Sequence, residues 1–359
     1  MDPTARVDPS KVDERILPRC LAWFALALCV TLSCAPAPAP VITPTVEPKA
    51  ELLHAGPLSD YVPAAGLRWL LLARPKSLAA DRDFMQALSP LVSKARLEAY
   101  RDSTGIDLTA LDSALIGGFD LGTLYLAEIR GDPSAIELAF RQRLVAEVEL
   151  REPHPRLTRI SGVIGNTPES LLLYRGQLIA QAVGDPTLIR VVEAFARGKL
   201  KRSPPALHGA ALGPLADFAR QAPVRLLVPG PFGGRWMMAA EGLFAAADAV
   251  ALSATPLAPG RVAMTVAIDG PWGESEEVAA AERLRVAWEK LSQSTTGELF
   301  GLDTPAALPT LEHSDTRVAL SVELELAPLV AGLRAAVSAE VEEILGPLEG
   351  TEDAPGERQ

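Results

Sequence analysis

Leu171-Leu-Leu-Tyr-Arg-Gly-Gln-Leu-Ile-Ala-Gln-Ala-Val-Gly-Asp-Pro186 is the stretch of the sequence that indicates the fold most directly. Three residues centred on Gly176 separate two apolar runs, 171–174 and 178–183, which is typical of a β-hairpin. Strands joined by so short a loop are antiparallel. The Gly-Asp-Pro that follows favours a helix start, because aspartate accepts from free amides of the first turn and proline has no amide to leave unpaired. The stretch therefore predicts an antiparallel hairpin followed by a helix.

The same order of a strand-like run and a proline-containing helix start occurs four times in the chain. Anion binding at these helix starts is an alternative, but aspartate already occupies the cap position in three of them and would repel an anion. We interpret them as structural. The four predicted pairs are strand 123–129 with helix 134–145, strand 178–183 with helix 187–196, strand 262–268 with helix 276–292, and strand 318–324 with helix 329–345.

The remaining apolar runs extend this pattern over both halves of the chain. Leu70-Leu-Leu-Ala-Arg-Pro75 in the first half is echoed by Leu226-Leu-Val-Pro-Gly-Pro231 in the second. The sequence therefore predicts an α+β fold, with helices on a mostly antiparallel sheet or on two related sheets, built from a unit that is duplicated over 51–200 and 206–346. Further strands are predicted at 67–73, 157–164, 170–174, 224–228 and 249–254, and further helices at 81–101 and 234–247.

The N-terminal residues 1–33 are typical of a secretory signal peptide. Basic residues between Arg6 and Arg19 precede the apolar run 21–33. This run is shorter than the roughly 20 residues that cross a bilayer as a helix. Thr31-Leu-Ser-Cys34 resembles the lipobox of bacterial lipoproteins, although Thr31 occupies the position where that family prefers leucine. The resemblance implies cleavage before Cys34 and acylation of its thiol with palmitate-type chains.

The distribution of cysteine supports the same interpretation. The chain has three cysteines, Cys20, Cys29 and Cys34, and none follows Cys34. An exported chain with one thiol at its first position has no partner for an internal disulfide, which favours acylation. The alternative is ordinary cleavage after Ala35 or Ala37, with Cys34 incidental. In the lipoprotein family an aspartate after the cysteine is associated with inner-membrane retention. Ala35 therefore implies an outer-membrane anchor that faces the periplasm or the exterior.

Segments 34–50 and 347–359 are predicted to lie outside the packed core. Alternating prolines in 34–50 favour extended polyproline II, so this segment is a linker between the anchor and the domain. The acidic tail 347–359 has little to bury and is predicted to be disordered. The remaining Ala/Leu/Pro-rich part is similar in style to uncharacterised exported proteins of high-GC Gram-negative bacteria. That similarity implies no site.

Composition and motifs make several classes of function unfavourable. The net charge of −11 makes nucleic acid and anionic lipid headgroups poor partners. The four histidines are far apart, and the run Glu312-His313-Ser314-Asp315 is more typical of a solvated turn than of a metal site. We find no nucleophile-elbow, P-loop or dinucleotide-binding motif. The sequence therefore predicts no catalytic, cofactor-binding or metal-binding residue.

Residues 236–247 carry the remaining candidate, a helix that is apolar on nearly all sides. Its large side chains could line a hydrophobic groove or a partner interface, while a helix buried in the core gives the same pattern. The leading hypothesis is a membrane-tethered envelope lipoprotein that acts in binding or assembly with another envelope protein. The second is a carrier or chaperone for a hydrophobic ligand, and the third is a hydrolase with a site assembled from distant residues. The groove candidates are Trp236, Met237, Met238, Leu243 and Phe244.

Overall fold

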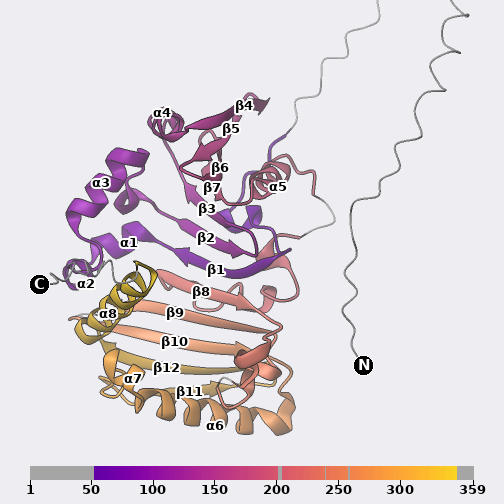
Figure 1. Ribbon diagram of the computed structural model, residues 1–359. Coiled ribbons are helices and arrows are strands. Elements are labelled where there is room, and N and C mark those ends of the chain that lie inside the picture. The colour runs from indigo at the N-terminus through magenta and orange to yellow at the C-terminus, as the bar shows by residue number, and fades with distance from the viewer. Residues whose placement is uncertain (1–51, 201–203, 239, 258, 346–359) are drawn as a thin grey trace, which may run out of the picture. The chain divides into compact units, whose positions relative to one another are not determined.

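The computed structural model describes residues 52–200, 204–238, 240–257 and 259–345. The predicted signal peptide, Cys34, the linker and the tail 347–359 lie outside these residues. One sheet of 12 strands runs through the described domain, in the order β11-β12-β10-β9-β8-β1-β2-β3-β7-β6-β5-β4. Figure 1 shows this sheet with helices packed against it. Every neighbouring pair of strands is antiparallel, which confirms the predicted α+β class with an antiparallel sheet.

The strands follow the predicted apolar runs closely, and three of them were not predicted at these bounds. The additional strands are β2, β4 and β11. The hairpin of the opening stretch is formed by β6 and β7, with Gly176 in the left-handed region at φ 74°. The strands are β1 (Leu67–Ala73), β2 (Ala114–Phe119), β3 (Thr123–Glu128), β4 (Ala146–His154), β5 (Leu157–Ile164), β6 (Thr167–Tyr174), β7 (Leu178–Val183), β8 (Val224–Pro229), β9 (Ala249–Leu257), β10 (Arg261–Asp269), β11 (Thr310–His313) and β12 (Arg317–Glu325).

Helices occupy the connections between these strands. No helix of the described residues combines the length and the apolar composition that a bilayer crossing requires. The α-helices are α1 (Pro75–Ala80), α2 (Arg82–Leu88), α3 (Lys94–Thr104), α4 (Ser134–Arg143), α5 (Thr187–Ala196), α6 (Gly273–Ser292), α7 (Thr295–Leu299) and α8 (Leu326–Leu345). Short 3-10 turns are η1 (Leu58–Tyr61), η2 (Leu108–Ala110), η3 (Ala206–His208), η4 (Gly213–Leu215), η5 (Gly234–Met238) and η6 (Leu243–Ala245).

The order of elements repeats on either side of the seam where β1 pairs with β8. Moving outward from the seam, one half contains β1, β2, β3, β7 and β6, and the other contains β8, β9, β10, β12 and β11. In both halves a helix, α4 or α6, leads from the third strand to the outer strands, and another helix, α5 or α8, follows the last of them. The first half carries two extra strands, β5 and β4, at its outer edge. The topology therefore agrees with a duplicated unit.

Side-chain alternation divides the sheet into two faces with different partners. The front face, defined by Ile116 and Tyr125, packs against α3 and α4 in the first half. The back face, defined by Leu115 and Leu126, packs against η1, α5 and η3. Because neighbours in a strand point to opposite faces, β2 contributes to both layers. In the second half α6 and α8 pack against the front face of the sheet. The two helices that end the halves, α5 and α8, therefore cover opposite faces.

Two predicted helices are interrupted. The helix predicted at 81–101 forms two helices, α2 and α3, separated at Ser89-Pro90 because proline cannot donate to the preceding turn. The helix predicted at 234–247 forms only the turns η5 and η6. Between these turns Ala240, Glu241 and Gly242 have φ values of 49°, 57° and 81°. This left-handed backbone ends a right-handed helix, so the prediction was wrong.

At two of the four predicted helix starts the first helical residue and the hydrogen bond from its amide to the aspartate are confirmed, but proline and not aspartate occupies the N-cap. Asp132 accepts from the amide of Ser134, and Asp185 accepts from the amide of Thr187, with the proline between them at the N-cap. At the third site Asp269 accepts from Arg317 instead, and α6 begins earlier than predicted, at Gly273. The fourth helix begins at Leu326 rather than 329. The local pattern therefore predicted all four helices, but the first residue of only two of them, α4 and α5.

Candidate functional site

A largely apolar cavity lies between the front face of the sheet and α3, and we call it the α3 cavity. Its volume is about 380 Å³, within the range of about 300 to 1,000 Å³ that is usual for small-molecule sites. The strands β2, β3 and β7 form one wall, and α3 with the segment after it forms the other. Side chains that line it include Tyr100, Thr104, Ile116, Tyr125, Arg143 and Ile179.

The sheet register brings the strand wall together. Ile116 of β2 lies opposite Tyr125 of β3, and Ala114 lies opposite Ala127, so all four side chains share the front face. Ala127 in turn lies opposite Ile179 of β7. The alanines leave space that larger side chains would fill. This combination of small and large residues on neighbouring strands produces a hollow in the layer.

The helix wall depends on the two ends of α3. Ser93 caps the first turn by accepting from the amide of Arg96, and Gly105 ends the helix at φ 74°. The hydroxyl of Thr104 donates to the carbonyl of Tyr100 and accepts from the amide of Ile106. These bonds turn the chain at the end of α3 and hold Tyr100 at the cavity wall.

Two polar side chains of this cavity have features that suit a ligand. Burial raises the pKa of Tyr100, while the nearby charge of Arg143 and the hydrogen bond with Thr104 oppose the increase. The Nε atom of Arg143 is buried and has no hydrogen-bond partner among the described residues. Its guanidinium carbon lies 5.7 Å from the centroid of the Phe140 ring. A buried donor without a partner is costly, so a ligand acceptor at this point would be stabilised.

The predicted groove residues are not part of this cavity. Trp236, Met237 and Met238 belong to η5 and are 54%, 45% and 79% exposed. Leu243 is fully buried, and the ring of Phe244 stacks with Trp236 at a centroid distance of 6.4 Å. The broken helix therefore presents three large apolar side chains to solvent and keeps one in the core.

The histidines that the sequence analysis considered as metal ligands have other partners in the structure. No group of three or more potential ligands of suitable geometry occurs in the described part of the chain. His313 lies 3.4 Å from Glu277, and the Nδ1 atom of His154 accepts from the amide of Arg156. Each of these histidines has a local partner.

The structure does bring two other histidines to one carboxylate. His54 Nε2 lies 2.9 Å from Asp60 Oδ2, and His208 Nε2 lies 3.5 Å from Asp60 Oδ1. Ser59 is adjacent in sequence, but no hydrogen bond in the described structure joins its hydroxyl to His208. Nucleophilic catalysis uses a nucleophile that is hydrogen-bonded to its base.

The residues of the α3 cavity were not candidates in the sequence. Tyr100, Tyr125 and Arg143 lie on a helix, a strand and another helix, and none belongs to a short motif. Only the pairing of β2 with β3 and the packing of α3 on α4 bring them together. The one available signal is the alternation in Thr123–Glu128, which places Tyr125 on the face opposite Leu124 and Leu126.

Comparisons with known proteins assign no function to the chain. No protein-family model matches it, and no curated protein sequence matches it. Solved structures that match include TP0453 in crystal form III, with 10% identity over 79% of this chain and 99% of that chain and a TM-score of 0.46. TP0453 in crystal form IV matches with 9% identity, coverage of 78% and 97%, and a TM-score of 0.46. A GTP binding regulator (TM1622) from Thermotoga maritima matches 24% of this chain and 66% of its own at 12% identity, with a TM-score of 0.19.

Proposed function

We propose that the chain is an exported lipoprotein of the cell envelope whose domain binds an amphipathic ligand in the α3 cavity. The proposal has two parts, the anchor and the ligand site. Cys34 follows a secretory apolar run, and no later cysteine exists to pair with it. The proline-rich segment that follows would keep the domain away from the bilayer surface. These features support an acyl anchor.

The anchor is tested by replacing Cys34 with serine. We expect the wild-type chain to partition with membranes and to carry added acyl mass, because several buried acyl chains bind far more firmly than one. The Cys34→Ser chain is expected to be released into the soluble fraction at its unmodified mass. Cys29→Ser is the matched control and should partition as wild type. Equal partitioning of both variants would remove the support for the anchor.

The ligand part rests on one observation, which is that the α3 cavity combines an apolar wall with the unpartnered Arg143 Nε. An apolar chain would lie against Ile116 and Ile179, and burial of each methylene group would contribute about 0.8 kcal/mol. A carboxylate or phosphate at the end of that chain would accept from Arg143. The site therefore favours an amphiphile with one anionic group over a purely apolar ligand.

A fluorescent fatty acid tests this site in the full chain. We expect saturable binding, and we expect Arg143→Met to lower the affinity by about tenfold or more because it keeps the side-chain length and removes the charged donor. Arg141→Met is the matched control, since Arg141 lies on the same helix and pairs with Glu137. Equal affinities in the two variants would contradict the assignment of Arg143. Absence of saturable binding in wild type would contradict the site itself.

A second candidate function is contact with another envelope protein through η5. The exposed side chains of Trp236, Met237 and Met238 support it, because large apolar residues that cluster on a surface often mark interaction sites. A pull-down from native envelopes should recover a protein partner with wild type and less of it with Trp236→Ser. Leu308→Ser, at an exposed apolar residue outside η5, is the control. Recovery that is the same for both variants would contradict this role.

A further inference from the structure

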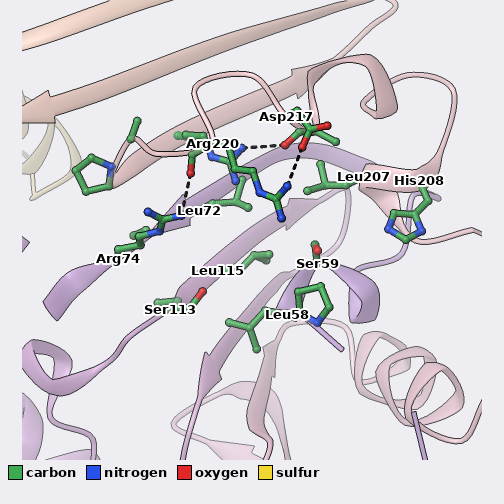
Figure 2. Close-up of a pocket in the computed structure, with 17 residues that line it drawn as sticks. Leu58, Ser59, Leu72, Arg74, Ser113, Leu115, Leu207, His208, Asp217 and Arg220 are labelled. Carbon is green, nitrogen blue, oxygen red and sulfur yellow. Dashed lines mark hydrogen bonds and ion pairs between the residues drawn. The ribbon is translucent and has the colours of Figure 1, made fainter. Parts of the chain in front are cut away.

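A second cavity lies at the seam between the two halves of the sheet, on the back face, and we call it the arginine cavity. Its volume is about 320 Å³. Strands β1, β2 and β8 contribute one side of it, and the segment 207–223 contributes the other. Figure 2 shows Arg74 and Arg220 together with Leu58, Ser59, Ser113 and Leu115, all of which line the cavity. The cavity shares no charged side chain with the α3 cavity.

Positive charge is concentrated around this cavity although the chain as a whole is acidic. Arg74, Arg220 and Arg225 line it, and Asp217 is the one carboxylate among its lining residues. Asp217 accepts from Arg220 at 3.3 Å and its side chain is 86% exposed, so water screens much of its charge. In the described part of the chain neither Arg74 nor Arg225 pairs with a carboxylate. The cavity therefore keeps an excess of positive charge.

Arg225 shows the consequence of this crowding. Its residue exposure is only 9%, and burial lowers the pKa of its guanidinium, with further lowering by Arg74 and Arg220. Its Nη1 donates to the carbonyls of Ala216 and Phe218. These two hydrogen bonds hold the Arg225 side chain in place, but the carbonyl groups carry no charge that would neutralise the guanidinium. A buried cation that faces other cations is stabilised when an anion enters.

Backbone contacts also hold Arg74 in place before any ligand binds. Its Nη2 donates to the carbonyl of Arg220 at 2.8 Å, and its Nη1 donates to the carbonyl of Gln221 at 3.4 Å. The two guanidinium groups of Arg74 and Arg225 are thus anchored from the same segment, 216–221. Such preorganisation reduces the side-chain ordering that anion binding would otherwise require.

We propose that the arginine cavity binds a small organic oxyanion, a carboxylate or phosphate joined to a short apolar group. The guanidinium groups of Arg74, Arg220 and Arg225 hold the oxyanion, because planar guanidinium groups match the geometry of carboxylate and phosphate. The apolar part lies against Leu58 and Leu115, which also line the cavity. Such an anionic group occurs in free metabolites and in lipid headgroups, and this proposal does not rest on the function proposed for the α3 cavity.

Calorimetric titration of the full chain with hexanoate, hexyl phosphate, inorganic phosphate and the neutral analogue 1-hexanol tests the proposal. We expect the two organic anions to bind and 1-hexanol not to bind measurably at the same concentration. Arg220→Gln should lower the affinity for hexanoate by about tenfold to a hundredfold, since a hydrogen bond to a charged group is lost. Asp217→Asn should raise the affinity, because it removes the carboxylate that competes for Arg220.

Two further variants test whether the binding of hexanoate that Arg220→Gln weakens takes place in the arginine cavity. Arg68→Gln is the matched control, since Arg68 forms an exposed pair with Asp120 elsewhere on the sheet, and it should leave the affinity unchanged. Arg143→Met should leave unchanged the binding event that Arg220→Gln weakens, which separates that event from any binding of hexanoate in the α3 cavity. Equal losses in Arg220→Gln and Arg68→Gln, or equal binding of hexanoate and 1-hexanol, would overturn the proposal. If Arg220→Gln does not fold, the opposite-signed effect of Asp217→Asn decides.

Vesicles of phosphatidylcholine with and without phosphatidylglycerol identify the source of the anion. Displacement of bound hexanoate by the anionic vesicles alone would identify a lipid headgroup as the ligand. Binding of hexanoate that neither vesicle displaces would identify a free anion. Displacement by both vesicles to the same extent would show that the anionic group is not what binds, and would contradict the proposal.

Discussion

Arg159 on β5 donates from Nη1 to Glu193 Oε2 on α5 at 2.6 Å, with both side chains nearly buried. This ion pair connects the back face of the sheet to the helix that covers it. Glu193 also accepts from Arg197 at 3.3 Å, one turn later on the same helix. Because the pair is removed from water, its partners depend on each other far more than the partners of a surface pair do.

Glu193→Ala is therefore expected to lower the free energy of unfolding by about 3–5 kcal/mol, because it leaves Arg159 charged and without its carboxylate. Urea denaturation at neutral pH measures this change. Glu98→Ala provides the comparison, since the pair of Lys94 and Glu98 is exposed on α3 and should contribute at most about 0.5 kcal/mol. Similar losses in both variants would contradict the assigned role of burial.

Alkaline pH is expected to destabilise the domain through Tyr61. Burial raises the pKa of Tyr61 to about 12, with smaller opposing effects from the hydrogen bond of the Gly56 amide. The folded state then holds the phenolic proton more tightly than the unfolded state, whose pKa is 10.0. The resulting stability is fully present below pH 10 and is lost as pH rises toward about 12. Denaturant unfolding at several alkaline pH values measures how steeply the free energy of unfolding falls with pH.

Tyr61→Phe should remove this fall of the free energy of unfolding at alkaline pH, and it should lower the stability at neutral pH. The hydroxyl of Tyr61 donates to the carbonyl of His54 and accepts from the amide of Gly56. Loss of both bonds is expected to lower the free energy of unfolding by about 1–3 kcal/mol. Tyr125→Phe, on the exposed side of the α3 cavity, is the control and should change neither quantity strongly. An unchanged alkaline slope in Tyr61→Phe would assign the titration to another group.

Gly105→Ala is expected to disturb the α3 cavity through the end of α3. Gly105 has a φ of 74°, and an added Cβ would lie 3.0 Å from backbone atoms of Ala135 and Ile136. We expect a loss of stability of about 1–3 kcal/mol and weaker binding of the fluorescent fatty acid. Gly131→Ala, where an added Cβ meets nothing within 4 Å and φ is not positive, should change neither. Thermal unfolding and ligand titration measure the two effects.

Ala127→Leu should distinguish an open cavity from a filled core. Ala127 lines the α3 cavity, so a larger side chain has space and is expected to block the ligand with little loss of stability. Ala267→Leu makes the same change on β10, where the alanine is fully buried in the core. That variant should lose about 1–3 kcal/mol through overpacking and should keep its affinity for the ligand. The reverse pattern would show that the α3 cavity is not the binding site.

Much of the fold follows from short-range patterns in the sequence. The apolar runs 171–174 and 178–183 and the turn at Gly176 predicted the β6–β7 hairpin, and Asp185 predicted the start of α5. By contrast, the apolar composition of 234–247 predicted a helix that Ala240, Glu241 and Gly242 interrupt. Apolar composition alone does not distinguish a continuous helix from two turns, of which η6 places Leu243 in the core while η5 leaves Trp236 and Met238 exposed.

The sequence by itself determined most strands, most helices and the antiparallel order of hairpins, because apolar strand runs and helix capping act over a few residues. It also supplies the reasons to expect a secretory segment and an anchor at Cys34. Only the tertiary structure decided which distant residues meet. The register of β2 with β3 brings Ile116 to Tyr125, and the pairing of β1 with β8 brings Arg74 to Arg225. Both cavities depend on these long-range pairings, which no local pattern in the chain encodes.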